Sequence, residues 1–134
     1  MKKNKNKKLP LVSVILNCYN SARFLKKSIN SVIAQSYQNW ELIIFDNCSS
    51  DNTKLEVIKF KKNKKIKYFK SKRLVNLYYA RNLAIEKARG SLITFLDADD
   101  WWIKDKLKFQ VRFLNHNKTS NVVYSNLFLF YEKK

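Results

Sequence analysis

The sequence has few of the residues that mark tight turns, disulfide frameworks or membrane spans. Glycine and proline occur once each in 134 residues, which argues against the closely spaced turns of a small β-barrel. The two cysteines, Cys18 and Cys48, cannot form a disulfide framework and lack zinc-site spacing, so we expect reduced thiols in a cytoplasmic protein. No apolar run reaches the roughly 18 residues of a membrane-spanning helix, and the short apolar run after MKKNKNKK is not that of a signal peptide.

Acidic residues are also scarce, with 10 Asp and Glu against 28 Lys and Arg. The formal net charge of +18 attracts polyanions such as nucleic acid, anionic lipid and phosphorylated substrates. Much of the charge lies in the tail, residues 1–9, and in Lys54 to Arg73. Aromatic side chains do not alternate with these lysines as they do on a base-stacking surface, which disfavours nucleic acid. We therefore expect peripheral contact with an anionic membrane at its inner face.

The remaining residues predict one α/β domain over residues 10–134. Apolar runs predict strands at 12–16, 41–45, 66–69, 92–96 and 122–130. Helical periodicity predicts helices at 21–35, 53–60, 77–89 and around 107–114, with Asn20 or Ser21 as a cap, a Thr53–Glu56 capping box, and Gly90 as a C-terminal stop. Alternation of strands and helices indicates a mostly parallel central sheet.

Three polar segments directly follow predicted strands: NCYN, DNCSSD and DADD. Ligands of open parallel sheets bind beyond the carboxyl ends of the strands. We therefore expect the three segments to converge on one edge of the sheet and to form a binding site there.

The DADD segment concentrates three of the scarce acids. Asp97 and Asp99 are two positions apart, so on an extended backbone they point the same way. Such a pair can share Mg²⁺ or Mn²⁺, whose other positions go to water and substrate phosphates. The alternative is that these carboxylates are solvated. For Asp100 we favour a role as the N-cap of the following helix.

The other candidates each have a functional and a structural interpretation. Asp46 and Asn47 can hydrogen-bond a base or a ribose, or can instead form an Asx-turn or a helix cap. Asp51 is expected to support the helix that follows it. Tyr19 can stack on a base or lie half buried. Arg81 can pair with a phosphate or lie on a solvated helix face.

Two long segments resemble the nucleotide-sugar half of family 2 glycosyltransferases with the GT-A fold. They are PLVSVILNCYNSARFLKKSINSVIAQSYQNWELIIFDNCSSDNT and ARNLAIEKARGSLITFLDADDWW, in family order and at family separations. The resemblance implies a Rossmann-like three-layer sandwich. It also implies a nucleoside held by Asn17, Tyr19, Asp46 and Asn47, a diphosphate near Arg81, and ribose and a divalent metal on Asp97 and Asp99.

The resemblance implies transfer of a sugar from a nucleotide-diphosphate donor to a saccharide, lipid-linked or protein-linked acceptor in surface glycan biosynthesis. Two departures stand out. Asn47 replaces an aspartate common in the family, and the chain stops where family members continue into the acceptor half, which supplies the catalytic base. Asp100 is only a stand-in candidate for that base. The alternative is a truncated module that binds a nucleotide sugar without transferring it, or one whose acceptor site a partner chain completes.

Overall fold

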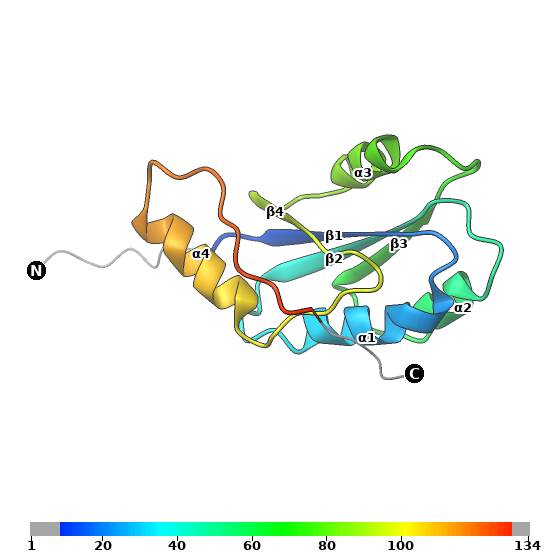
Figure 1. Cartoon of the computed structure of the whole chain (residues 1–134), viewed down its shortest axis with the longest axis horizontal. Coiled ribbons are helices and arrows are strands. Elements are labelled where there is room, and N and C mark those ends of the chain that lie inside the picture. Colours follow the sequence, from blue (N-terminus) through cyan, green and yellow to red (C-terminus); the bar gives the residue numbers. More distant parts are fainter. Residues whose placement is uncertain (1–8, 130–134) are drawn as a thin grey trace, which may run out of the picture.

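The computed structural model describes residues 9–129, which form a parallel β-sheet covered by helices on both faces (Figure 1). The four strands lie in the order β3-β2-β1-β4, and all neighbouring pairs are parallel. Along the chain, the elements are β1 (Val12–Cys18), α1 (Ala22–Ile33), β2 (Trp40–Asp46), α2 (Thr53–Ile58), β3 (Ile66–Lys70), α3 (Leu77–Ile85), β4 (Leu92–Phe95) and α4 (Lys106–His116). Within this described range, no helix has the length and apolar character needed to cross a bilayer.

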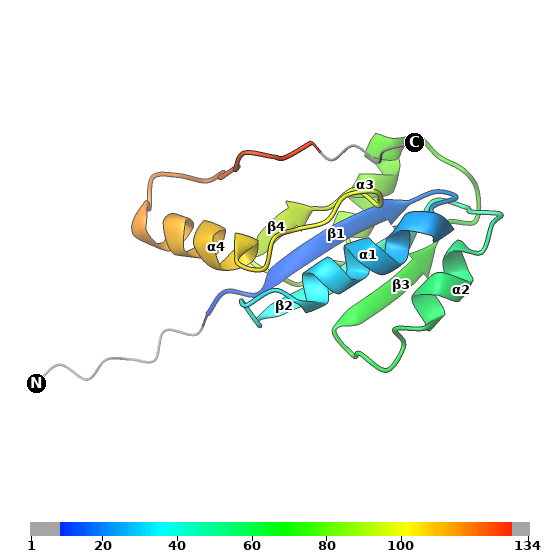
Figure 2. The same cartoon turned by 60° about the horizontal axis from the view of Figure 1, so that its bottom comes forward.

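The core consists of two apolar layers because strand side chains alternate between the faces of the sheet. On one face, Val14 and Leu16 of β1 pack with α1, α2 and α4. On the other face, Ile15 packs with Ala80 and Ala84 of α3. The small alanine side chains let α3 approach the sheet closely. The predicted three-layer α/β sandwich is therefore confirmed, and Figure 2 shows α1, α2 and α4 together on one side.

The predicted last strand, 122–130, is wrong over the residues that the structure describes. Residues 122–129 form no strand, and Tyr124 and Phe128 are almost fully exposed. The apolar and aromatic composition favours a strand, but a strand also needs a hydrogen-bonded neighbour, and this segment has none among residues 9–129. The predicted basic tail, residues 1–9, lies outside the described residues except for Leu9.

The predicted helix caps also differ from the structure. Ser21 precedes α1 but its side chain makes no cap hydrogen bond. The Thr53–Glu56 capping box does not form, because Asn52 is the N-cap of α2 and the Thr53 hydroxyl instead accepts from the Ser21 backbone N–H. Tertiary hydrogen bonds between the two loops thus replace the local caps that the sequence pattern predicts.

Gly90 does not stop α3, which ends five residues earlier at Ile85. The glycine is needed for a close approach of the backbone. A Cβ atom at this position would lie 2.6 Å from the Leu11 carbonyl oxygen and 2.7 Å from the Ser13 nitrogen. Both are backbone atoms of the first strand and the residue before it, so the chain cannot accommodate a side chain by rotating a rotamer.

We expect Gly90→Ala to lower the free energy of unfolding by about 1–3 kcal/mol, the usual cost of overpacking. Urea denaturation of the purified variant measures this loss. The exposed neighbour Ser91 provides the control, and Ser91→Ala is expected to stay within about 0.5 kcal/mol of the parent. Equal stability of the two variants would contradict the close-packing role of Gly90.

Candidate functional site

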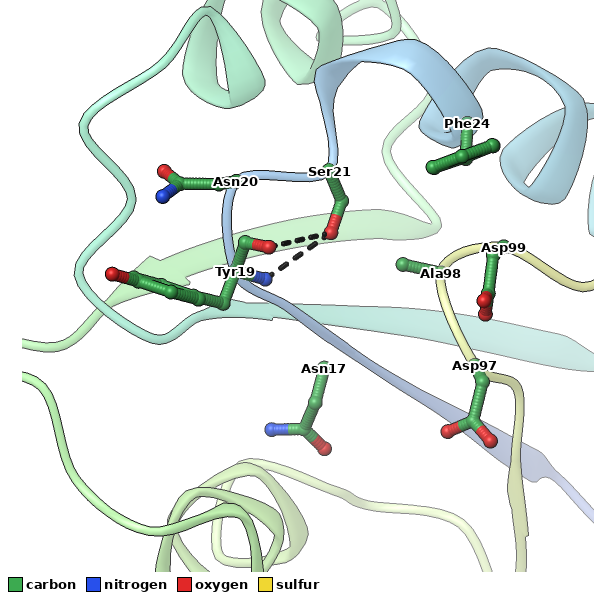
Figure 3. A pocket seen from close by; sticks show the side chains of 8 residues that line it. All are labelled: Asn17, Tyr19, Asn20, Ser21, Phe24, Asp97, Ala98 and Asp99. Atoms are coloured by element: carbon green, nitrogen blue, oxygen red, sulfur yellow. Dashed lines mark hydrogen bonds between the residues drawn. The ribbon is translucent and has the colours of Figure 1, made fainter.

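A pocket of about 370 Å³ opens at the carboxyl ends of β1 and β4. Two loops form it: the one between β1 and α1 and the one that follows β4 (Figure 3). Its lining residues are Asn17, Tyr19, Asn20, Ser21, Phe24, Asp97, Ala98 and Asp99. Two of the three polar segments that the sequence predicted to converge, NCYN and DADD, therefore do meet at one edge of the sheet.

Asp97 and Asp99 both line the pocket (Figure 3), although not for the reason that their spacing suggested. The backbone there is a turn rather than an extended strand, because the Asp100 N–H donates to the Asp97 carbonyl oxygen at 3.1 Å. The Ser28 hydroxyl of α1 fixes this turn, because its one proton is shared between the carbonyl oxygens of Ala98, at 2.5 Å, and Asp100, at 2.7 Å. The backbone of the turn is thus anchored to α1, while the carboxylates of Asp97 and Asp99 are exposed to solvent.

A cation from α3 partly compensates the charge of this acidic turn. The Arg81 guanidinium lies 2.9 Å from Oδ1 of Asp97. Burial, and then the charges of Asp99 and Asp97, raise the pKa of Asp100 above its ordinary value. The predicted N-cap role of Asp100 is wrong, because α4 begins at Lys106 and its N-cap is Asp105. The loop between the acidic turn and α4 is longer than the cap prediction assumed.

The donor set suits a hard divalent cation that also binds a ligand. Asp97 and Asp99 offer two exposed carboxylates on one wall. Across residues 9–129, no group of three or more His, Cys, Asp or Glu side chains could hold a metal by itself. Mg²⁺ commonly binds through one or two carboxylates together with waters and substrate phosphates. Two carboxylates beside an open pocket fit this mode of binding.

The opposite wall, from β1, presents an amide and an aromatic ring. Both polar side-chain atoms of Asn17 are buried, and neither has a hydrogen-bond partner among the described residues. Tyr19 is half exposed at the edge of the pocket. An unpaired buried amide costs free energy of folding, and no described residue offsets this cost for Asn17.

Asp46 and Asn47 do not line the pocket, although the sequence placed them with its ligands. The buried Asp46 carboxylate accepts hydrogen bonds from the Ser49 N–H, at 2.7 Å, and from the Tyr68 hydroxyl. Burial and the bond to Asp46 raise the pKa of Tyr68. The Asn47 amide bonds to both the N–H and the C=O of Val75. In this structure the two side chains therefore fix the loops after β2 and β3. Only the Asp46–Ser49 bond is a local contact of the kind that the structural interpretation anticipated, because Asn47 bonds to a residue 28 positions away.

Asp51 supports the start of α2, the helix that follows it, as predicted, and it also supports the start of α1. Its carboxylate accepts from the Thr53 N–H of α2, at 2.9 Å, and from the Ala22 N–H of α1, at 3.1 Å.

The sequence analysis missed Ser28, which holds the acidic turn. The available signal was a polar residue between Leu25 and Ile29 on the apolar face of a predicted helix, because a buried hydroxyl requires a hydrogen-bond partner. The pocket residues Asn20 and Phe24 were also missed as lining residues. Asn20 was predicted only as a helix cap, and Phe24 lies within the helix predicted at 21–35, where no binding role was assigned to it.

Known proteins resemble this chain in both sequence and fold. The family model for glycosyl transferase family 2 matches residues 13–133. The Escherichia coli UDP-Glc:alpha-D-GlcNAc-diphosphoundecaprenol beta-1,3-glucosyltransferase WfgD is 41% identical over 110 residues, 82% of this chain and 43% of WfgD. The putative teichuronic acid biosynthesis glycosyltransferase TuaG of Bacillus subtilis is 40% identical over 106 residues, 78% of this chain and 42% of TuaG.

The crystal structure of S. aureus TarS 1-349 superimposes with a TM-score of 0.75 at 28% identity, covering 80% of this chain and 33% of TarS. The chain therefore spans less than half the length of these relatives. Its parallel sheet and the family match over residues 13–133 agree with each other. The chain belongs to glycosyl transferase family 2.

Proposed function

We propose that this chain binds the donor in the transfer of a sugar from a nucleotide-diphosphate sugar to an acceptor of surface glycan biosynthesis. The pocket at the ends of β1 and β4 carries the proposal, because it places two exposed carboxylates opposite an unpaired amide and an aromatic ring. Carboxylates that share a divalent cation suit a diphosphate, and an amide with a ring suits a nucleoside. The family match supports the same reading.

Each side chain has a distinct role in this proposal. Asn17 and Tyr19 contact the nucleoside by hydrogen bonding and stacking. Arg81, which now pairs with Asp97, turns its guanidinium to the diphosphate. Asp97 and Asp99 hold Mn²⁺ or Mg²⁺, which neutralises the charge that develops on the leaving diphosphate.

Asp46 and Asn47 belong to the proposed nucleoside site through the loops that they fix. Asn47 fixes the loop that leads to α3, so a change of its amide would shift the start of the helix that carries Arg81.

Solved structures of similar fold support the ligand class. TarS has been crystallised with UDP and with UDP-GlcNAc. The Pyrobaculum calidifontis mannosyltransferase PcManGT, a likeness of fold at 24% identity, was solved with GDP-Man and Mn²⁺. The name of WfgD describes a lipid-linked acceptor. We accordingly propose a glycan or lipid-linked acceptor for this chain and a location at the inner face of the cell membrane.

The second candidate is a module that binds a nucleotide sugar without transferring it, or one that a partner chain completes. The observation that favours it is that this chain spans only 43% of WfgD. A general base must reach the acceptor hydroxyl, and Asp100, the stand-in candidate, does not line the pocket. An assay of released nucleotide, with the purified chain, UDP-sugars and lipid extract, separates the two candidates. Turnover excludes the binding module. Binding of the UDP-sugar without turnover favours the binding module.

We expect UDP or GDP together with Mn²⁺ to raise the melting temperature of the chain. A ligand at about ten times its dissociation constant adds roughly 1.4 kcal/mol to the free energy of unfolding, which corresponds to a shift of about 3–6 °C for a domain of this size. Differential scanning fluorimetry measures the shift, with EDTA in place of Mn²⁺ as the control. If no common nucleoside diphosphate at about millimolar concentration shifts the transition, the donor-binding proposal fails.

A further inference from the structure

The start of α3 and the loop before it present large apolar side chains to solvent. Leu74 is 56% exposed, Leu77 49%, Tyr78 78% and Tyr79 51%. These four residues, which we call the α3 patch, lie within six consecutive positions. Large apolar side chains that are exposed close together often mark a binding surface.

The patch is held in its exposed position by hydrogen bonds to its neighbours. The Asn76 side chain caps α3 by accepting from the Tyr79 N–H at 2.9 Å. Val75, between Leu74 and Asn76, is bound through both its N–H and its C=O to the Asn47 amide. The loop is therefore anchored to the sheet on its polar side, and its apolar side chains cannot fold back into the core.

Cationic side chains border the patch. Lys72 and Arg73 directly precede Leu74 and are exposed. Within residues 9–129, neither side chain makes an ion pair. Apolar and aromatic side chains beside lysine and arginine suit an anionic bilayer surface, where the rings and leucines enter the interface and the cations meet the head groups.

The patch lies at the same edge of the sheet as the pocket. The helix α3 starts where β3 ends, at the carboxyl edge, and runs back across the sheet (Figure 1). Arg81, one helical turn after Leu77, pairs with Asp97 of the pocket wall. A bilayer bound to the patch would therefore stand next to the pocket opening.

A second pair of exposed apolar side chains, on α4, resembles the α3 patch in chemistry and serves as its control. Phe109 is 59% exposed and Phe113 47%, on α4, with the exposed Lys108 and Arg112 beside them. The helix α4 lies at the other end of the sheet from α3 (Figure 1). The backbone N–H of Leu107 and the C=O of Ile103 bond to Gln35, just beyond the end of α1. This pair is therefore remote from the pocket.

We propose that the α3 patch docks the chain on an anionic lipid surface, with Lys72 and Arg73 at the head groups and Leu74, Leu77 and Tyr78 in the interface. The choice of this edge over α4 rests on the proposed function, since a lipid-linked acceptor must approach the pocket. Binding to lipid itself does not require a nucleotide, so the two proposals fail independently.

Flotation with vesicles of phosphatidylcholine, alone or with about 30% phosphatidylglycerol, tests the proposal on the full chain without nucleotide. We expect binding only to the anionic vesicles. The variant Leu74→Ser/Leu77→Ser/Tyr78→Ser is expected to bind at least about tenfold more weakly. The variant Lys72→Gln/Arg73→Gln is expected to lose roughly 10- to 30-fold, and less in high salt. Phe109→Ser/Phe113→Ser, the matched control, is expected to bind as the parent does.

Several outcomes would overturn the proposal. The first is that the Leu74, Leu77 and Tyr78 variant binds anionic vesicles as the parent does. The second is that the α4 control loses binding instead. The third is that binding is lost only when residues 1–8 are deleted, which would assign it to the basic tail. Light scattering that finds a dimer dissociated by the patch substitutions would assign the surface to a second copy of the chain. Circular dichroism and the melting temperature of each variant verify that it is folded.

Discussion

Replacing Asp99 with asparagine is expected to weaken metal-dependent binding of a nucleoside diphosphate by at least about 10- to 100-fold, the range found when support for a bound metal is removed. The physical reason is the small number of protein ligands. Asp97 and Asp99 are the two carboxylates on the pocket wall, so one substitution removes half of the anionic donors while the side chain keeps its size. Isothermal titration calorimetry with UDP or GDP, in Mn²⁺ and in EDTA, measures the change.

Glu86→Gln provides the matched control for this substitution. Glu86 is exposed at the C-terminal end of α3, outside the pocket, and its replacement also removes one negative charge. We expect it to leave the affinity within about twofold, because Glu86 does not line the pocket and salt screens the interactions of solvent-exposed charges. Equal affinity of the Asp99→Asn variant and the parent in Mn²⁺ would show that the acidic turn does not bind the metal.

Replacing Glu41 is expected to produce the largest loss of stability. This β2 carboxylate is 2% exposed and accepts hydrogen bonds from Ser13, at 2.8 Å, from the Arg89 backbone N–H, at 2.7 Å, and from Lys67, at 3.0 Å. It thereby joins β1, β3 and the segment after α3. Glu41→Ala leaves these donors unpaired, and we expect about 3–5 kcal/mol less free energy of unfolding, as for other broken buried pairs.

The pH dependence of the free energy of unfolding distinguishes the role of Glu41 as a charged hydrogen-bond acceptor from a role in packing alone. Burial by itself would raise the pKa of Glu41, but the hydrogen bonds from Arg89, Ser13 and Lys67 outweigh it and lower the pKa from 4.5 to about 2. A carboxyl whose pKa is lower in the folded state stabilises the fold fully above its unfolded pKa, and this contribution is lost as the pH falls. The stability difference between the parent and Glu41→Gln should therefore shrink between about pH 4.5 and pH 2.

Urea denaturation at several pH values measures both effects. The control is Glu56→Gln, which removes a helix-surface ion pair with Lys59 and should cost no more than about 0.5 kcal/mol. If Glu41→Gln is as stable as Glu56→Gln at pH 7, the network around Glu41 does not stabilise the fold.

The periodicity of apolar residues predicted the four strands of the sheet and the four helices. VSVIL and ELIIF are mainly apolar because β1 and β2 are buried on both faces, which a sheet covered by two helical layers provides. Their two polar residues, Ser13 and Glu41, are also buried and hydrogen-bond to each other. The pattern at 122–130 failed because strand formation depends on a neighbouring strand. Propensity does not specify that neighbour, and none is present among the described residues.

The sequence by itself determined that polar loops gather at one edge, because parallel strands bring their carboxyl ends together. The tertiary structure placed β1 beside β4, and so decided that NCYN and DADD form the pocket. Only the tertiary structure decided which side chains remain available there. Asp46 and Asn47 follow β2 just as the acids of the DADD segment follow β4, yet Tyr68, Ser49 and Val75 engage them. Asp97 and Asp99 instead face an open pocket. Two of these partners, Tyr68 and Val75, are 22 and 28 positions away from the residues they engage, and local spacing carries no information about such contacts.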